Sequence, residues 1–185
     1  MKRAYWFSMI MAIPLLTLGS LSFGDDDDDN FFKFWKRQPG IAPVTNVLYK
    51  EECGSCHFAY QPGWLPEQSW REMMSNLEDH FEDNAELSPA NQKVILDYLV
   101  NNSADNADYR RSKKIMRSLG DASTPQRITE ISYIKHEHDE IPAQLISKND
   151  KVASLSHCDA CHQDADKGSF SERQIKIPGH GKWDD

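Results

Sequence analysis

The stretches CGSCH at residues 53–57 and CDACH at residues 158–162 contain every cysteine of the chain. Each places two thiols three positions apart, with a histidine directly after the second thiol. Covalent attachment of haem c requires this pattern, because the two thiols form thioethers with the haem vinyl groups and the histidine binds the iron. The motifs therefore predict two covalently bound haem c groups. The attachment residues are Cys53, Cys56, Cys158 and Cys161, and the proximal iron ligands are His57 and His162.

Two other uses of paired cysteines explain the pattern less well. A redox-active disulfide needs no histidine after the second cysteine, and a thioredoxin-like site would sit at a strand–helix junction that the sequence does not show. A zinc site built from four cysteines gives no reason for a histidine directly after each pair. Haem attachment accounts for both features in both motifs.

The composition agrees with a small protein that folds around large cofactors. The chain has 185 residues, which suits one domain or two small ones, and only 39% of them are hydrophobic. Two haem macrocycles would supply apolar bulk that the side chains lack. The net charge of −8 argues against a nucleic-acid partner, whose phosphates attract a basic surface. The aromatic content and short apolar runs argue against disorder and against several membrane spans.

The N-terminus predicts export from the cytoplasm. Lys2 and Arg3 precede a stretch without charge that ends at Gly24, and small residues close it. We expect residues 1–24 to be a signal peptide that is removed, which places the mature protein in the periplasm with a net charge of −10. The alternative is an uncleaved membrane anchor, because the uncharged stretch is long enough to span a bilayer. Residues 25–42 form an acidic and aromatic leader, predicted to be solvated in its acidic part.

Residues 43–105 predict a small helical domain around the first haem, similar to a class I cytochrome c domain. We expect a helix at 46–52 that Thr45 caps, a loop at 58–66 whose carbonyls orient His57, and a helix that starts with a Ser69/Glu72 capping box. The helix that starts with this capping box is predicted to carry an apolar face of Trp70, Met73, Leu77, His80 and Phe81.

The distal side of the first haem has two candidate ligands. His80 stands just before the last helix of the domain, where class I cytochromes usually have a methionine, and it is the predicted ligand. Met73 is the alternative, and His80 would then only stabilise a helix end. The last helix is predicted to begin at Ser88-Pro89 and to pack through Val94, Ile95, Tyr98 and Leu99.

Residues 106–185 predict a largely irregular region wrapped around the second haem. Only 23 residues follow His162, too few for the closing helices of a second class I domain. The basic run at residues 110–117 is interpreted as a solvated helix face, with pairing to haem propionates or docking as the functional alternative. His136 and His138 lie two positions apart, so only one of them is expected to face the iron, and His180 is the third candidate.

The sequence resembles the soluble periplasmic dihaem cytochromes c of photosynthetic and facultative bacteria over roughly residues 43–179. The resemblance implies bis-histidine ligation of both irons, with His80 at the first and His138 at the second, and a role as electron donor to a high-spin, oxygen-binding monohaem cytochrome. His136 departs from the family pattern as a competing ligand. The matching stretches are 52–63, Asp79-His80-Phe81, Asn84-Ala85, Arg127-Ile128-Thr129, and a tail that includes Cys158, Asp164, Gly168, Phe170, Ile175 and Ile177-Pro178-Gly179.

Together these observations predict a mainly α-helical, dihaem electron carrier that works by outer-sphere transfer and is not an enzyme. Its acidic charge favours a small redox partner with a basic docking face. Two alternatives stay open. An enzyme or gas sensor would need one iron with an open sixth position. A membrane-tethered redox subunit would need residues 4–24 to stay attached.

Overall fold

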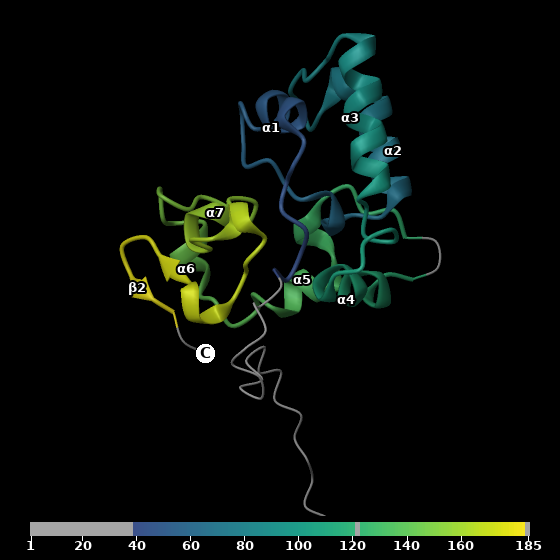
Figure 1. Ribbon diagram of the computed structural model, residues 1–185. Coiled ribbons are helices and arrows are strands. Elements are labelled where there is room, and N and C mark those ends of the chain that lie inside the picture. The colour runs from purple at the N-terminus through teal and green to yellow at the C-terminus, as the bar shows by residue number, and fades with distance from the viewer. Residues whose placement is uncertain (1–38, 121–122, 184–185) are drawn as a thin grey trace, which may run out of the picture. The chain divides into compact units, whose positions relative to one another are not determined.

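The computed structural model describes residues 39–120 and 123–183, all of which fall in one compact unit (Figure 1). The predicted signal peptide and the leader up to residue 38 lie outside the described residues. Within the described part, the chain is mainly helical, as the sequence predicts, and no helix is long and apolar enough to cross a membrane. The domain boundary expected at residues 105 and 106 stays a prediction.

The first part of the chain folds into three α-helices joined by short 3-10 turns. The helices are α1 (Val47–Cys53), α2 (Glu67–Ser75) and α3 (Pro89–Asn101), and the 3-10 helices are η1 (Pro62–Trp64) and η2 (Leu77–Asp79). Helices α2 and α3 pack along each other, and α1 crosses near them (Figure 1). The predicted start of α3 is confirmed, since Ser88 caps it by accepting a hydrogen bond from the amide of Asn91, with Pro89 as the first helical residue.

Two predicted helix starts are wrong. The side chain of Asn46, and not that of Thr45, accepts from the amide of Tyr49 and caps α1. Helix α2 begins at Glu67, so Ser69 lies inside it as a buried residue and forms no capping box. The amide of Glu67 instead donates to the carboxylate of Asp105, at 3.0 Å. A cap from so far along the chain leaves no local signal in the sequence.

The predicted helical stripe from Trp70 to Phe81 is also wrong beyond α2. The α-helix ends at Ser75, and after η2 the backbone takes positive φ values at Phe81 (57°) and Glu82 (80°). A right-handed helix cannot continue through left-handed backbone, in which the side chain crowds the neighbouring carbonyl. His80 and Phe81 therefore lie in a turn and not on a face of α2. In α3, Ile95 and Leu99 are buried as expected, whereas the side chain of Val94 points to solvent.

The second part of the chain consists of short elements separated by turns. After the basic helix α4 (Arg110–Ser118), the chain forms η3 (Ile128–Glu130) and α5 (Ser132–His136). It continues through α6 (Ala143–Ile146), α7 (Cys158–Cys161), η4 (Ala165–Lys167), η5 (Glu172–Gln174) and an antiparallel pair, β1 (Lys176–Ile177) and β2 (Gly181–Lys182).

Two separate apolar clusters hold these elements. The main cluster has fifteen buried residues drawn from both parts of the chain, from Ile41 to Phe170. The C-terminal cluster has three, Val152, Ile175 and Ile177, with partly buried neighbours that include Cys161 and Trp183. At about 25 cal/mol per Å² of buried apolar surface, three residues supply little stabilisation on their own. The C-terminal cluster therefore needs another apolar surface to pack against.

Candidate functional site

The first attachment motif starts inside a helix and ends at an ordered histidine. Cys53 is the last residue of α1, and Cys56 is exposed one turn later. The ring of His57 is held by a hydrogen bond from its Nδ1 to the carbonyl oxygen of Phe58, at 2.8 Å. Because a carbonyl only accepts, Nδ1 carries the proton and Nε2 is left with a lone pair. This confirms the expectation that a carbonyl of the loop orients His57.

His80 lies directly across from His57. The centres of the two rings are 6.2 Å apart and their planes differ by 23°. A tight turn places His80, since its amide donates to the carbonyl of Asp83 and its carbonyl accepts from the amide of Asp83. Met73 packs against the main apolar cluster, which is the ordinary role of a methionine on this face.

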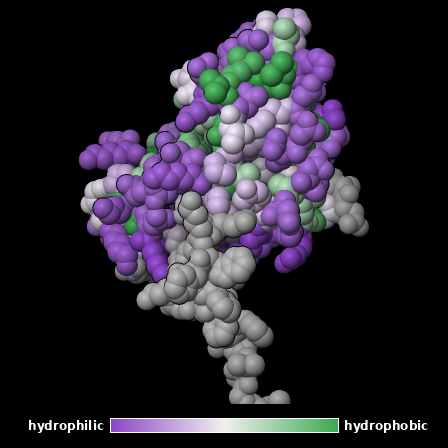
Figure 2. Space-filling view, viewed as in Figure 1, coloured by the Kyte–Doolittle hydropathy of each residue, from purple (hydrophilic) through white to green (hydrophobic). Residues whose placement is uncertain are grey.

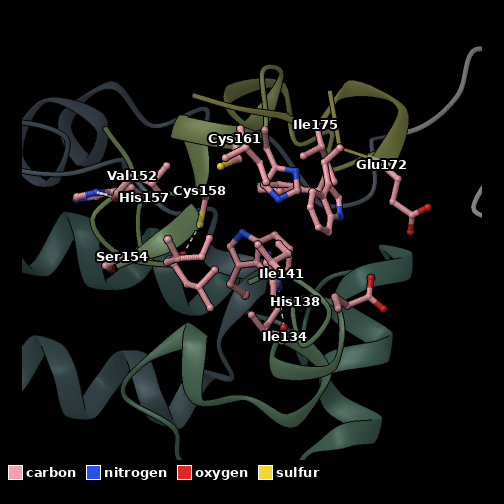
Figure 3. Close-up of a pocket in the computed structure, with 18 of the residues that line it drawn as sticks. Ile134, His138, Ile141, Val152, Ser154, His157, Cys158, Cys161, Glu172 and Ile175 are labelled. Atoms are coloured by element: carbon pink, nitrogen blue, oxygen red, sulfur yellow. Dashed lines mark hydrogen bonds between the residues drawn. The ribbon is translucent and has the colours of Figure 1, made fainter. Parts of the chain in front are cut away.

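The second attachment motif lines a pocket between the two apolar clusters (Figure 3). It encloses about 800 Å³ of space that no protein atom fills, part of it continuous with solvent. Trp64, Ile134 and Phe170 of the main cluster line it together with Val152, Ile175 and Ile177 of the C-terminal cluster. Cys158 and Cys161 lie on one side of this space, and Ile134 and His138 lie on the other (Figure 3).

His138 faces the second proximal histidine, and His136 does not. The ring centres of His138 and His162 are 6.1 Å apart, with planes at 80°. Nδ1 of His138 donates to the carbonyl of Ile134, at 2.7 Å, so Nε2 again has a free lone pair. The side chain of His136 is 79% exposed and pairs with Asp139. His180 is exposed and does not line the pocket, although its ring packs near Trp183, which does.

The ring distances fit one iron between each histidine pair. A metal–nitrogen bond of about 2 Å on each side, plus about 1 Å from nitrogen to ring centre, gives roughly 6 Å between opposed imidazole centres. Both pairs meet this distance, at 6.2 and 6.1 Å. Cysteines next to one histidine of each pair complete the set of groups that haem c needs. The residues present therefore fit two haem c groups.

Burial keeps the histidines in the form that binds metals. The pKa of His162 is lowered to about 3, chiefly by burial and then by His138 and Arg111. Burial, followed by the neighbouring His57, also lowers the pKa of His80. Neutral imidazole is the ligand form, so neither ring needs to lose a proton before it binds iron near neutral pH.

The four cysteines form no common metal site in the part of the chain that the structure describes. None of the four has a disulfide partner, and the described residues contain no cluster of three or more potential metal-binding side chains. Burial raises the pKa of the Cys53 thiol to about 11 and that of Cys158 to about 12. These thiols therefore ionise poorly, unlike those of redox-active cysteine pairs, whose pKa values lie below the ordinary range.

One tyrosine connects the two sites. The ring of Tyr60 stacks on His57, with centres 5.0 Å apart. Its hydroxyl donates to the carbonyl of Ser156, at 2.7 Å, two residues before the second motif. Next to it, the Gln61 side-chain amide donates to the carbonyl of Ala165, which follows that motif. The loop after the first motif thus holds the second motif in place.

Sequence reasoning missed an ionic group beside the second site. Arg111 belongs to the basic run interpreted as a solvated face, yet it is 7% exposed and lines the pocket together with Glu137. Arg110, Lys113 and Arg117 of the same helix are exposed, as expected. A signal was present, because Arg111 precedes the buried Ile115 by four residues and so shares its helix face.

Comparisons with known proteins find similarity to dihaem cytochromes c. Residues 49–170 match the model of the dihaem cytochrome c family. A dihaem cytochrome c from Shewanella baltica OS155 is 42% identical, with a TM-score of 0.63 over 75% of this chain and 98% of its own. A dihaem cytochrome c from Rhodobacter sphaeroides is 38% identical, with a TM-score of 0.63 over 70% of this chain and 99% of its own. No curated protein matches.

Proposed function

The chain belongs to the dihaem cytochrome c family and carries two covalently bound haem c groups, and we propose that it transfers electrons through two low-spin, bis-histidine sites. His57 and His80 hold the first iron, and His162 and His138 hold the second. When bound, each haem supplies an iron that changes by one electron between the ferric and ferrous states. The protein holds the four imidazoles in place and leaves no iron position open for a substrate.

The opposed imidazoles carry this proposal. In both sites, two rings face each other at the distance that one iron requires. Backbone carbonyls accept from Nδ1 of His57 and of His138, so Nε2 of each ring keeps the lone pair that would bind iron. A site that is preset for six ligands changes little between oxidation states, and such a site suits outer-sphere electron transfer better than ligand binding. Because histidine replaces methionine, we expect lower potentials than in His/Met cytochromes.

Absorption spectra of the holoprotein test the ligation. We expect two haems per chain, both low-spin when oxidised and reduced, without the charge-transfer band of a methionine–iron bond and without a shift under carbon monoxide. A high-spin component or a carbon monoxide shift would show an open or labile iron. The enzyme or gas-sensor function would then replace electron transfer as the better explanation.

The partner that we propose is a small, high-spin monohaem cytochrome with a basic face, which accepts electrons at the first site. Five acidic residues around His80 are exposed: Glu78, Asp79, Glu82, Asp83 and Glu86. Phe81 among them is 38% exposed. Val47 of α1 and Val94 of α3 are also exposed, and Figure 2 shows hydrophobic side chains gathered over the region of these two helices. An apolar patch with a charged rim is typical of transient protein interfaces.

Salt dependence tests this docking. We expect the bimolecular rate with a basic cytochrome to fall as ionic strength rises, because screening weakens attraction between opposite charges. Reversing Glu82 and Asp83 to lysine should lower the rate more than reversing Asp150, an exposed acidic residue in the second half of the chain. A stopped-flow rate that does not depend on salt would contradict the proposed partner but leave the ligation untouched.

We also propose that the protein works in the periplasm after residues 1–24 are removed. The basic start, the uncharged stretch and its small closing residues support this location. Covalent attachment of haem to both motifs agrees with export. N-terminal sequencing of the purified protein tests it, with Asp25 as the expected first residue. A protein that still begins at Met1 and sediments with membranes would support the tethered alternative.

A further inference from the structure

Arg111 is the one buried cation that lines the pocket of the second site in the described structure. It extends from α4 and is held on several sides. One guanidinium nitrogen donates to the hydroxyl of Tyr133, at 2.7 Å, and contacts the carboxylate of Glu137 at 3.3 Å. The other terminal nitrogen donates to the carbonyl of Phe170, at 2.7 Å. These contacts fix the position of the charge.

The charge of Arg111 reaches the second site. Phe170 packs against the His162 ring, with centres 5.1 Å apart, so the guanidinium is two contacts from the proximal ligand. Glu137 neutralises part of the charge. Its side chain is 21% exposed, however, against 9% for Arg111, so water screens the carboxylate more than the guanidinium.

A buried positive charge favours the reduced state of a nearby iron. Reduction removes one positive charge from the site, and repulsion between like charges in a medium of low dielectric makes that removal favourable. The first site has the opposite surroundings, since exposed carboxylates of residues 78–86 flank His80 and favour the ferric state. Arg127, a cation near His80, is exposed and stacks on Phe81 at 4.1 Å.

We propose that Arg111 raises the reduction potential of the haem at Cys158 and Cys161 above that of the haem at Cys53 and Cys56. This inference rests on the proposed bis-histidine ligation. With both haems bound, this order of potentials would favour transfer of one electron from the iron that His57 and His80 would hold to the iron that His162 and His138 would hold. The first site would accept electrons from outside, and the second site would hold the electron at equilibrium.

The imidazole planes make the two haems distinguishable in one sample. The planes are nearly parallel at the first site, at 23°, and nearly perpendicular at the second, at 80°. Nearly perpendicular planes leave two iron d orbitals close in energy, and the ferric site then gives an electron paramagnetic resonance signal at higher g than a site with parallel planes. Each haem therefore has its own signal during a redox titration.

The test is a potentiometric titration of the holoprotein, with frozen samples followed by electron paramagnetic resonance. We expect the high-g signal of the second haem to disappear first as the potential is lowered. In one-electron-reduced protein, some chains have the second haem reduced and others have the first haem reduced. In the Arg111→Gln variant, the ratio of the former to the latter should fall by tenfold or more, which corresponds to about 59 mV for one electron. Arg111→Lys keeps the charge and should keep most of the original order.

Glu137 provides the matched opposite charge and a variant that is easier to fold, because its side chain is more exposed than that of Arg111. Glu137→Gln removes one negative charge beside Arg111 and should move the second haem's potential upward, opposite to Arg111→Gln. Damage to packing would instead move both variants in the same direction. Shifts of the same sign, or a wild-type second haem that is reduced last, would overturn the inference.

The same spectra separate this inference from the proposed function. Two low-spin signals with the wrong order of reduction would contradict the role of Arg111 and leave the ligation standing. A high-spin ferric signal in the wild-type protein would contradict the bis-histidine ligation, and the role of Arg111 would fall with it.

Discussion

The two haem sites perform one chemistry with different construction. The first is assembled from residues 53–80, a continuous stretch that packs against the main apolar cluster. The second collects its lining from α4, α5, α7, strand β1 and the segments between them, and it lies between the two apolar clusters. The first haem would therefore pack against a core that forms without it, whereas the second would bring separate segments of the chain together.

The largest expected effect concerns this difference in construction. Replacing Cys158 and Cys161 with alanine should leave one haem per chain and detach the C-terminal cluster, because its three buried residues face the pocket. Limited proteolysis should then cleave within residues 140–183. The matched variant, with Cys53 and Cys56 replaced, should also keep one haem but protect the same segment. Equal protection in both variants would show that the second haem does not join the clusters.

Removing a distal histidine should break one site and spare the other. His138→Ala takes away the ring that faces His162, so we expect half of the haem to become high-spin and to bind carbon monoxide. His136→Ala serves as the control, since its side chain is exposed. The visible spectrum with and without carbon monoxide measures both variants. A carbon monoxide shift in the His136 variant alone would exchange the roles of the two histidines.

A close backbone contact ties the N-terminal segment to the loop after the second motif. Gly168 has a φ of 74°, and a Cβ there would lie 2.1 Å from the carbonyl oxygen of Ile41. We expect Gly168→Ala to lower the free energy of unfolding by about 3 kcal/mol or more, combining backbone strain with the clash. Gly179→Ala has a similar φ of 80° with open space around it, and should cost only about 1 kcal/mol. Denaturant unfolding of both holoproteins measures the difference.

The smallest expected effect concerns the link between the sites. Tyr60→Phe removes the hydrogen bond to the Ser156 carbonyl and should lower the free energy of unfolding by about 1 kcal/mol. The control is Tyr98→Phe, which removes an exposed hydrogen bond from the Thr45 amide. Its cost should be smaller, because water replaces the lost partner. Thermal unfolding compares the two, and a larger loss in the Tyr98 variant would argue against Tyr60 as the link.

Short-range patterns determined much of this protein from the sequence alone. Two CxxCH motifs specify two haem c groups, because the chemistry needs only neighbouring side chains. Ser88 and Pro89 start α3, since capping and a fixed φ act within one turn. The mainly helical class follows from apolar spacing that is equally local.

Contacts between distant segments decided the rest. Asp105 caps α2 from another part of the chain, so the start of that helix could not be located from its own residues. The sequence does not distinguish His136 from His138. In the fold, Ile134 is buried in the main cluster and its carbonyl accepts from Nδ1 of His138, whose side chain lines the pocket. Arg111 looks like its exposed neighbours in sequence, but Tyr133, Glu137 and Phe170 bury it. Burial depends on what the fold brings alongside a residue, and no local pattern carries that information.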